Sequence, residues 1–468
     1  MSTPIPAAAA RPSRAHARAG ALGPLVGPLS APRFAPRFAP LVGALSSALL
    51  TACASLAPPH TAPALPVPAT WAAADAAAPA RSPPAPPDIG WQDYFIDPAL
   101  QALIAQALAH NRDLRQAALR VDQARAAYGI QRADSQPLLA AQADVTRART
   151  PADLNLSRRP LEGNAWQVGL GLASWELDVW GHLRSLQDAA LATYLASDDA
   201  RRAVSLGLVA QVAQGYLALC ELDERLALAR QTLASRAESL RITGRRVDVG
   251  ASSRLQLTQV RTLLTQAQAL VLQLDQARDQ QAHALALLVG ASVDAPVDLP
   301  PRPQALGSAA LARPLPAGLS AELLRQRPDV AAAERQLQAS NALIGAARAA
   351  FYPRITLTGA LGTASAELDG LFAGGSRAWT FTPSVQLPLW DGDRRRNNLA
   401  LAGFKRDEAL ARYEQVVQAA FRDVADALSA RASLGQQLRV AQDALDAQTE
   451  RARLSQLRFD QGAAAYLD

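Results

Sequence analysis

Isolated histidines and one loop with two aspartates are the residues of this 468-residue chain whose types could support catalysis or metal binding. His60, His110, His182 and His283 stand far apart in the sequence. We find no H-E-x-x-H, G-x-S-x-G or P-loop motif that would create a zinc site, a nucleophile or a phosphate cradle. Residues 391–396 (DGDRRR) lack the other ligands of a calcium loop, and an acidic helix start followed by solvated arginines explains them better. The sequence therefore predicts no catalytic residue, no metal site, no cofactor and a protein that is not an enzyme.

Cys53 is the residue for which the sequence predicts covalent chemistry. A basic stretch and a short apolar core over 41–50 precede it, as in a secretory signal. The tetrapeptide Leu-Thr-Ala-Cys that ends at this residue resembles a bacterial lipobox, in which the thiol is lipidated and begins the mature chain. Each buried acyl CH₂ group contributes about 0.8 kcal/mol, so several acyl chains hold a protein at a membrane. We expect residues 1–52 to be a signal peptide; the alternative is an ordinary signal with a chance cysteine.

The charge distribution argues against a nucleic-acid partner. The net charge is +6, but residues 1–52 contain five arginines and no acidic residue. Removing these five charges leaves +1 for residues 53–468. Because this part is nearly neutral and carries no nucleic-acid-binding motif, we expect no nucleic-acid binding.

Proline spacing separates a tether from long helices. Eighteen of the 32 prolines precede residue 91, and we interpret 53–90 as a lipidated Pro/Ala-rich tether. No proline occurs over 161–295 or 389–468. Long helices can run there, because proline breaks helix interiors.

Two long helices are predicted in the first proline-free stretch. One covers about 183–243 and the other about 253–289, and a glycine followed by serine capping candidates separates them. At 1.5 Å per residue, the first helix is on the order of 90 Å long. The two form an antiparallel hairpin, and Cys220 is expected to be a small buried helix residue rather than a reactive thiol.

Four short segments alternate between apolar residues and polar or small ones. They cover 141–146, 166–173, 355–361 and 379–387, and each is about as long as a tilted membrane strand. Tryptophans flank them, as in the aromatic belts of membrane barrels. A soluble, half-buried hairpin is the alternative, because periodicity alone does not separate the two.

The chain also repeats itself. Residues 111–138 align without a gap on 327–354, an offset of 216 residues. Each half runs helix, strand, strand, long helix and glycine turn, which indicates a duplicated domain. The first half continues with a further helix that has no counterpart in the second, so we expect the final helix to be missing from this sequence. We assign 91–300 to the first structural repeat, 301–319 to a linker and 320–468 to the second structural repeat.

Four strands that face lipid cannot close a barrel within one chain. An open strand edge in hydrocarbon leaves backbone groups unpaired, and the smallest membrane barrels have about eight strands. Several copies must therefore combine: a dimer would give a barrel filled by side chains, and a trimer would give a pore. The long helices also need neighbours, because their apolar stripes must be buried.

Five motifs follow the lipobox at Cys53 in this order: 91–100 (WQDYFIDPAL), 107–114 (ALAHNRDL), 175–181 (WELDVWG), 324–329 (LRQRPD) and 349–353 (AAFYP). With these motifs the chain resembles the TolC-type outer-membrane efflux ducts, and among them the lipoprotein NodT branch. The resemblance spans nearly all of residues 90–468 and implies a mainly α fold with a small β part. In that fold a homotrimer forms a 12-strand transmembrane β-barrel continued by a periplasmic α-helical barrel.

The resemblance also implies a function. The protein would be the outer-membrane exit duct of a tripartite efflux or export system, passively conducting small molecules. Its partners would be a periplasmic adaptor, an inner-membrane pump of the RND type and outer-membrane lipid. Ala54, in place of an Asp after the lipidated cysteine, favours the outer membrane by lipoprotein sorting rules. The alternative is a lipoprotein scaffold of periplasmic helical hairpins without a pore.

The helix-turn tips are the candidate functional residues that the resemblance implies, because adaptors dock and the tunnel closes there. Exposed ion pairs suit a gate, since each is worth only about 0–1 kcal/mol. Simple helix capping and solvated charge are the alternatives. Gln256 stands where family members often carry Asp, so tip chemistry can differ between the halves. The tip candidates are Arg246, Asp248, Val249, Gly250, Ser253 and Leu255 in the first half, and Arg458, Asp460, Gly462, Leu467 and Asp468 in the second.

Overall fold

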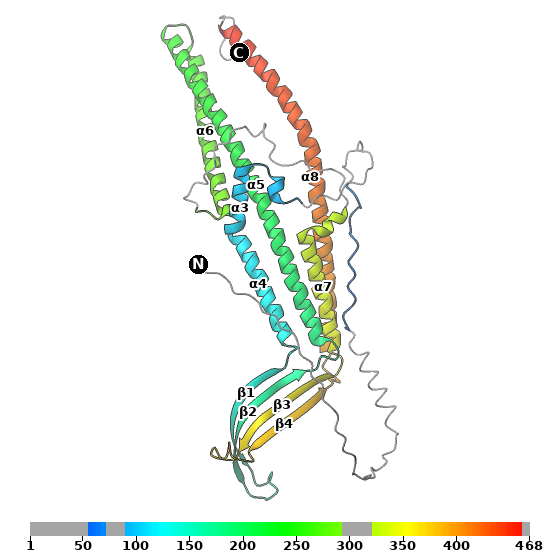
Figure 1. Ribbon diagram of the computed structural model, residues 1–468. Coiled ribbons are helices and arrows are strands. Elements are labelled where there is room, and N and C mark those ends of the chain that lie inside the picture. Colours follow the sequence, from blue (N-terminus) through cyan, green and yellow to red (C-terminus); the bar gives the residue numbers. More distant parts are fainter. Residues whose placement is uncertain (1–54, 72–88, 293–320, 461–468) are drawn as a thin grey trace, which may run out of the picture. The chain divides into compact units, whose positions relative to one another are not determined.

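The computed structural model describes residues 55–71, 89–292 and 321–460. Contacts divide the chain into two units, Met1–Ala52 and Cys53–Asp468, and all described residues belong to the second. Figure 1 shows the elements of this unit. In chain order they are α2 (Trp91–Tyr94), α3 (Pro98–His110), α4 (Arg112–Ala133), β1 (Leu138–Thr150), β2 (Leu161–Glu176), α5 (His182–Asp248), α6 (Arg254–Val289), the 3₁₀ helix η1 (Ala321–Gln326), α7 (Pro328–Ala349), β3 (Arg354–Ser365), β4 (Arg377–Gln386) and α8 (Arg394–Asp460).

Two helices of 67 residues each, α5 and α8, dominate this unit. α5 packs against α4, α6 and α7 (Figure 1). It contains an 18-residue window with a mean hydropathy of 1.5, apolar enough by composition to cross a membrane. Because 39% of that window is buried against its neighbours, packing accounts for part of this apolar character. Cys220 is a buried residue of this helix, as predicted.

Side-chain caps and prolines set where the shorter helices begin. Asp97 accepts hydrogen bonds from the backbone N–H groups of Ala99 and Leu100 at the start of α3. Asn111 does the same for Leu114 at the start of α4, at 2.9 Å. α7 begins at Pro328, where proline is tolerated because no intrahelical partner is available to its nitrogen.

The duplicated fold class is confirmed. Both bounds of α4 and of α7 differ by the 216 residues found in the sequence, and so do the first residues of β1 and β3. A long helix follows each strand pair. The two repeats therefore share one local architecture.

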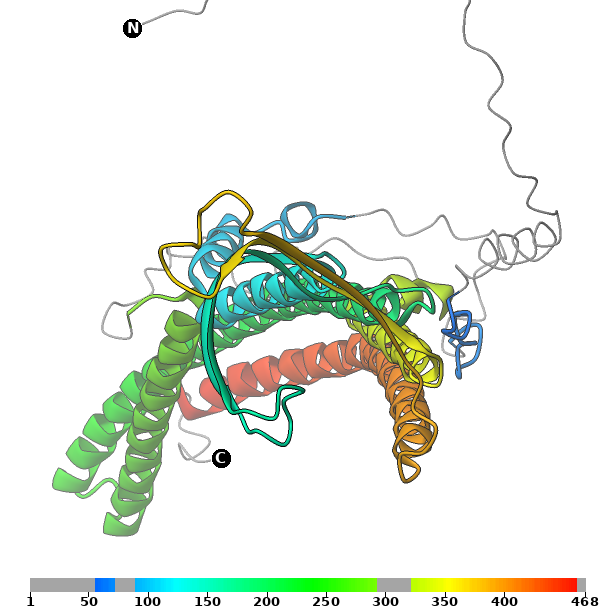
Figure 2. The same cartoon turned by 90° about the horizontal axis from the view of Figure 1, so that it is seen from below.

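The four strands form one antiparallel sheet in the order β1-β2-β3-β4. The sheet is curved and lies at one end of the helices (Figures 1 and 2). The strands have 13, 16, 12 and 10 residues, longer than the segments predicted from alternation. The extra residues pair in the same ladders. One irregularity, between Leu172 and Trp175 of β2, shifts its register against β3.

The two larger clusters of buried side chains each hold together the helices of one repeat. The first joins α3, α5 and α6 around Tyr216, which is fully buried. The second joins η1, α7 and α8 around Tyr413, which is also fully buried. Each repeat thus has its own core.

Residues 55–71, part of the predicted tether, pack against the second repeat, and we call them the strap. Arg348, near the end of α7, donates to the carbonyl oxygen of Leu56 at 3.1 Å. Arg325, before the start of α7, donates to the carbonyl oxygen of Pro63 at 3.2 Å. The strap therefore runs antiparallel to α7.

The strap ends in the core of the second repeat. Trp71 is 7% exposed and stacks on Phe421 of α8 with ring centroids 4.9 Å apart. Its indole N–H donates to the carbonyl oxygen of Phe421 at 2.9 Å. Leu65 and Val67 pack on the same cluster. The composition indicated an extended segment, but these apolar side chains between the prolines give it a surface that packs.

Candidate functional site

One face of the sheet carries a continuous apolar surface. Directly paired residues of antiparallel strands lie on the same face. Ala141, Leu170, Leu361 and Trp379 form one such row across all four strands. The neighbouring row on this face contains Leu139, Leu172, Gly359 and Phe381. We call this the apolar face; it has the character of a surface in contact with lipid.

The opposite face carries polar and small residues, and we call it the polar face. One row pairs Gln142 with Gly169, Gly362 and Ala378. Other rows contain Asp144 with Gln167, and Thr358 with Thr382. A Cβ atom added to Gly169 would lie 2.5 Å from the carbonyl oxygen of Leu361, so β2 and β3 need glycine for their close approach. A polar face of this kind suits a water-filled lumen.

The edges of the sheet are the strands β1 and β4. In the part of the chain that the structure describes, each of these strands pairs on one side only. An open edge is not viable in hydrocarbon, because its backbone groups lack hydrogen-bond partners. The apolar and polar faces together therefore require closure by further strands.

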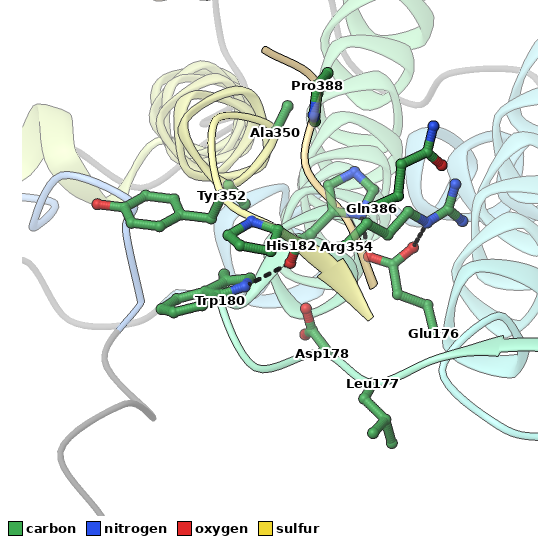
Figure 3. A pocket seen from close by; sticks show the side chains of 12 residues that line it. Glu176, Leu177, Asp178, Trp180, His182, Ala350, Tyr352, Arg354, Gln386 and Pro388 are labelled. Carbon is green, nitrogen blue, oxygen red and sulfur yellow. Dashed lines mark hydrogen bonds and ion pairs between the residues drawn. The ribbon is translucent and has the colours of Figure 1, made fainter. Parts of the chain in front are cut away.

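The junction between the sheet and α5 is fixed by a charged cluster, shown in Figure 3. Glu176, at the end of β2, pairs with Nδ1 of His182 at 3.0 Å and with Nε of Arg354 at 2.6 Å. Asp178 accepts from the backbone N–H groups of Leu183 and Arg184 and so caps the start of α5. A cavity of about 290 Å³ lies among these groups. Glu176 and Asp178 lie in the WELDVWG motif, but no sequence pattern predicted that they belong to such a cluster.

Trp180 completes the junction. Its indole N–H donates to the carbonyl oxygen of Pro353 at 2.8 Å, and its ring stacks on Tyr352 with centroids 4.8 Å apart. Asp391 occupies the matching junction of the second repeat. Its carboxylate accepts from the backbone N–H of Arg395 at 3.1 Å and from the side chain at 2.7 Å. The DGDRRR loop is therefore an acidic helix start, as predicted.

The first helix-turn tip lies at the end of the helices away from the sheet (Figure 1). α5 ends in a Schellman motif: Ala251 N–H donates to the carbonyl of Arg246 at 2.7 Å, and Gly250 N–H to that of Val247 at 3.0 Å. Gly250 has φ +76°, in the left-handed region that favours glycine.

The start of α6 completes this tip. Ser253 caps the helix by accepting from the backbone N–H of Gln256 at 3.2 Å. Val249 and Leu255 are 78% and 69% exposed there. Helix capping thus explains why Gly250 and Ser253 occupy this turn, whereas it does not explain the exposed apolar side chains of Val249 and Leu255. Arg246 and Asp248 lie in the last turn of α5.

The second tip is described only in part. Arg458 is exposed in the last turn of α8, and Asp460 is the last residue of that helix. Gly462, Leu467 and Asp468 lie outside the described residues, as does Cys53. The predicted gate ion pairs of this tip therefore stay predictions.

A family model described as outer membrane efflux protein matches residues 103–291 and 319–468. The chain belongs to the outer membrane efflux protein family. Outer membrane protein OprJ of Pseudomonas aeruginosa is 43% identical over 413 residues, which are 88% of this chain and 85% of OprJ. Toluene efflux pump outer membrane protein TtgI of Pseudomonas putida is 43% identical over 376 residues, 80% of this chain and 79% of TtgI.

Solved channels of this family share the fold. A membrane protein from Pseudomonas aeruginosa superposes with a TM-score of 0.79 at 41% identity, covering 88% of this chain and 90% of that one. The open-state MtrE outer membrane channel of Neisseria gonorrhoeae gives 0.73 at 34% identity, covering 87% and 89%. The fold class is therefore that of a TolC-type channel, with a β-barrel continued by a helical barrel.

Membership settles the class of function. The protein is an outer-membrane efflux channel that extends into the periplasm and serves as an exit duct. The family is a transport family and not an enzyme family. The apolar and polar faces are the outer and inner surfaces that such a channel wall requires. The family assigned from sequence motifs is confirmed.

Proposed function

We propose that this chain forms a lipid-anchored homotrimeric duct that accepts small molecules from an RND-type inner-membrane pump through a periplasmic adaptor. The observation that carries the proposal is the two-faced sheet with two open edges. Three copies of four strands supply a 12-strand barrel, wide enough to leave a lumen. The duct itself is passive, and the pump supplies the energy.

Lipidation of Cys53 fits the course of the strap. Ser55 lies beside Gly181, with its Cα 3.8 Å from the position of an added Cβ. Gly181 is at the junction of sheet and helix, where a barrel would meet the periplasmic face of the membrane. Two residues of chain span at most about 7 Å, so acyl chains on Cys53 would enter the adjoining leaflet. Intact-mass measurement of the mature protein tests this: wild type should carry acyl mass, and Cys53→Ser should not.

Adaptor docking at the tips is supported by Val249 and Leu255. Both are exposed apolar side chains at the end of a helical hairpin, where a partner helix would bury them. We assign docking or gating to the tip set, which also includes Arg246, Asp248, Gly250 and Ser253 in the first repeat and Arg458, Asp460, Gly462, Leu467 and Asp468 in the second.

The gating assignment has a direct test. Arg246→Glu and Asp460→Lys should change leak conductance or adaptor affinity, because exposed ion pairs contribute only about 0–1 kcal/mol each and break readily. Arg439→Glu, a charge reversal on an exposed stretch of α8, is the matched control. Unchanged conductance, adaptor affinity and assembly in both reversal variants would remove the tip assignment.

The names of the relatives point to a class of substrate for this duct. TtgI is named as a toluene efflux protein, SrpC as a solvent efflux protein and ArpC as an antibiotic efflux protein. We propose small organic molecules as the cargo of this duct too. Selectivity would reside mainly in the pump.

Conductance in planar bilayers tests the duct itself. Purified trimers should give discrete channel events, and export of a toxic solvent should be restored when the chain is expressed with a related adaptor and pump in cells lacking their own duct. Trimers that insert but never conduct, alone or with the adaptor, would contradict the proposal.

A further inference from the structure

Three arginines stand on the apolar face at the end of the sheet away from the helices. Arg147 and Arg149 continue the outward alternation of β1 beyond Val145. Arg377 pairs with Thr363 in the row that also contains Val168. The side chains of Arg147 and Arg149 are 78% and 69% exposed. The apolar surface therefore ends in a basic border.

The nearby carboxylate of Glu162 does not neutralise these arginines or satisfy their hydrogen-bond donors. Glu162 lies 3.8 Å from Arg147 and 3.7 Å from Arg149, which is beyond hydrogen-bond distance for both. A guanidinium group has five N–H donors in a fork that matches carboxylate or phosphate. One carboxylate between two arginines leaves positive charge and unused donors.

The duplication predicts how this border continues across copies. The pairing of β2 with β3 is a seam between repeats, and a closed trimer must make the equivalent seam between β4 and the β1 strand of the next copy. Glu176 pairs with Thr356 near the base of the internal seam. By the repeat alignment, these positions correspond to Gln386 and Ala140.

Counting outward from Gln386 and Ala140 fixes the seam between copies. β4 pairs with β3 without a register shift, so the count needs no bulge. It places Phe381 opposite Val145 of the next copy, which keeps apolar residues on one face. It places Thr380 opposite Thr146 on the polar face. At the end of the seam, Arg377 lies opposite Arg149 of the next copy.

This register brings like charges face to face. Directly opposite like charges destabilise a strand pair, so the seam needs a bound anion. The helices are periplasmic, so this end of the strands lies at the outer leaflet, just beyond the exposed aromatic residues Trp379 and Phe381. We propose that each subunit seam binds a phosphate group of a phosphorylated glycolipid of the outer leaflet, held by Arg149 and Arg377 with Arg147 beside them. This inference rests on the trimeric barrel proposed above.

The seam is tested first, by disulfide trapping in membranes. Thr146→Cys with Thr380→Cys, in a Cys220→Ala background, should link copies because directly paired Cα atoms meet disulfide geometry. Thr146→Cys with Ser384→Cys is the control, four residues out of register on the same face. We expect at least about tenfold more cross-linked trimer from the first pair. No inter-copy link from either pair would contradict the trimer itself, and a stronger link from the control pair would contradict the register.

The lipid is tested on purified trimers of wild type, of Arg149→Gln/Arg377→Gln and of the control Arg439→Gln, which removes an arginine from α8 instead. Phosphorylated glycolipid retained after a fixed detergent wash is measured by mass spectrometry. Delipidated trimers are then titrated with lipid A, with dephosphorylated lipid A and with inorganic phosphate, and their dissociation temperature is followed.

Wild type and Arg439→Gln should retain the lipid, and the double variant should retain about tenfold less, since charge-assisted hydrogen bonds are lost. Only lipid A should raise the dissociation temperature. Equal retention by the double variant, or equal stabilisation by dephosphorylated lipid A or by inorganic phosphate, would overturn the lipid site. If that happened while Thr146 and Thr380 still cross-linked, the trimeric duct would stand and only this inference would fall.

Discussion

The two repeats share one local architecture but bury their surfaces differently. In the first repeat, α3 supplies Leu100, Ile104 and Ala107 to the core. In the second repeat, η1 is only six residues long, and the strap supplies Trp71 to the matching region of the fold. A duplicated sequence therefore does not duplicate its packing, because each copy meets a different remainder of the chain.

The two strand-to-helix junctions differ in the same way, because each contains a tryptophan and the two tryptophans have different surroundings. Trp180 is held by Tyr352 and Pro353 of the neighbouring repeat. Trp390, at the matching position, is 88% exposed. In the proposed trimer the neighbour of β4 would be another copy, so the same tryptophan would serve an internal seam in one repeat and an external seam in the other.

The largest loss of stability among the variants that test this difference between the repeats is expected at Trp71. Trp71→Ala should destabilise the second repeat by about 3 kcal/mol, because a buried, stacked indole is lost from its core. Urea unfolding followed by tryptophan fluorescence and by proteolysis of α8 measures it, with the exposed strap residue Thr61→Ala as control. If Trp71→Ala left unfolding unchanged, the strap would be a passive tether after all.

The next effect distinguishes the two junctions. Trp180→Ala should cost about 2 kcal/mol within one chain, since a hydrogen bond and an aromatic stack are lost. Trp390→Ala should change the stability of the isolated chain by less than about 0.5 kcal/mol but lower the yield of trimer. Unfolding of dissociated chains and trimer yield by size-exclusion chromatography separate the two outcomes. Equal effects on both measurements would mean that the junctions are equivalent.

A smaller effect sharpens the contrast between two turns of the first repeat. Gly250→Ala should cost about 1 kcal/mol, because alanine is strained at positive φ while the space around it is open. Gly290→Ala should cost more, because its φ is +72° and an added Cβ would lie 2.5 Å from the carbonyl oxygen of His110. Thermal unfolding of the two variants compares them, and a costlier Gly250→Ala would contradict the open tip.

The smallest expected effect is the pH dependence that the pair of Asp329 and Arg327 contributes to the second repeat. Burial raises the pKa of Asp329, but the hydrogen bond and charge of Arg327 outweigh it and hold the pKa below its ordinary value of 3.8. The pair therefore stabilises the fold above pH 3.8 and loses that contribution as the pH falls through the lowered pKa.

Asp329→Asn should remove this dependence at a cost below about 1 kcal/mol, because the pair is partly exposed. Urea unfolding at stepped pH measures it. Asp113→Asn is the matched control, since Asn111 stands where the second repeat has Arg327. A wild-type acid transition that persists in Asp329→Asn would assign the dependence to other groups.

Much of the fold was predictable because its signals are local. Proline-free stretches and glycine turns predicted the long helices, and alternation predicted four strands with one apolar face. The helix ends were predicted less well: α5 extends to Asp248, five residues beyond the estimate, because the Schellman motif at Gly250 ends it. The tip residues were reached through the family resemblance, whereas the Glu176 cluster was missed because its members come from separate elements.

The sequence by itself determined the periodicities and the helix caps, because each depends on residues within a few turns of one another. It also determined the duplication, because two stretches of sequence can be aligned without knowing how they pack. Only the tertiary structure decided which surfaces the repeats present. The hydrogen bond from Trp71 to Phe421 joins residues 350 positions apart, and the pairing of β2 with β3 includes a register shift. Contacts over such separations depend on how all the elements pack at once, so no local pattern encodes them.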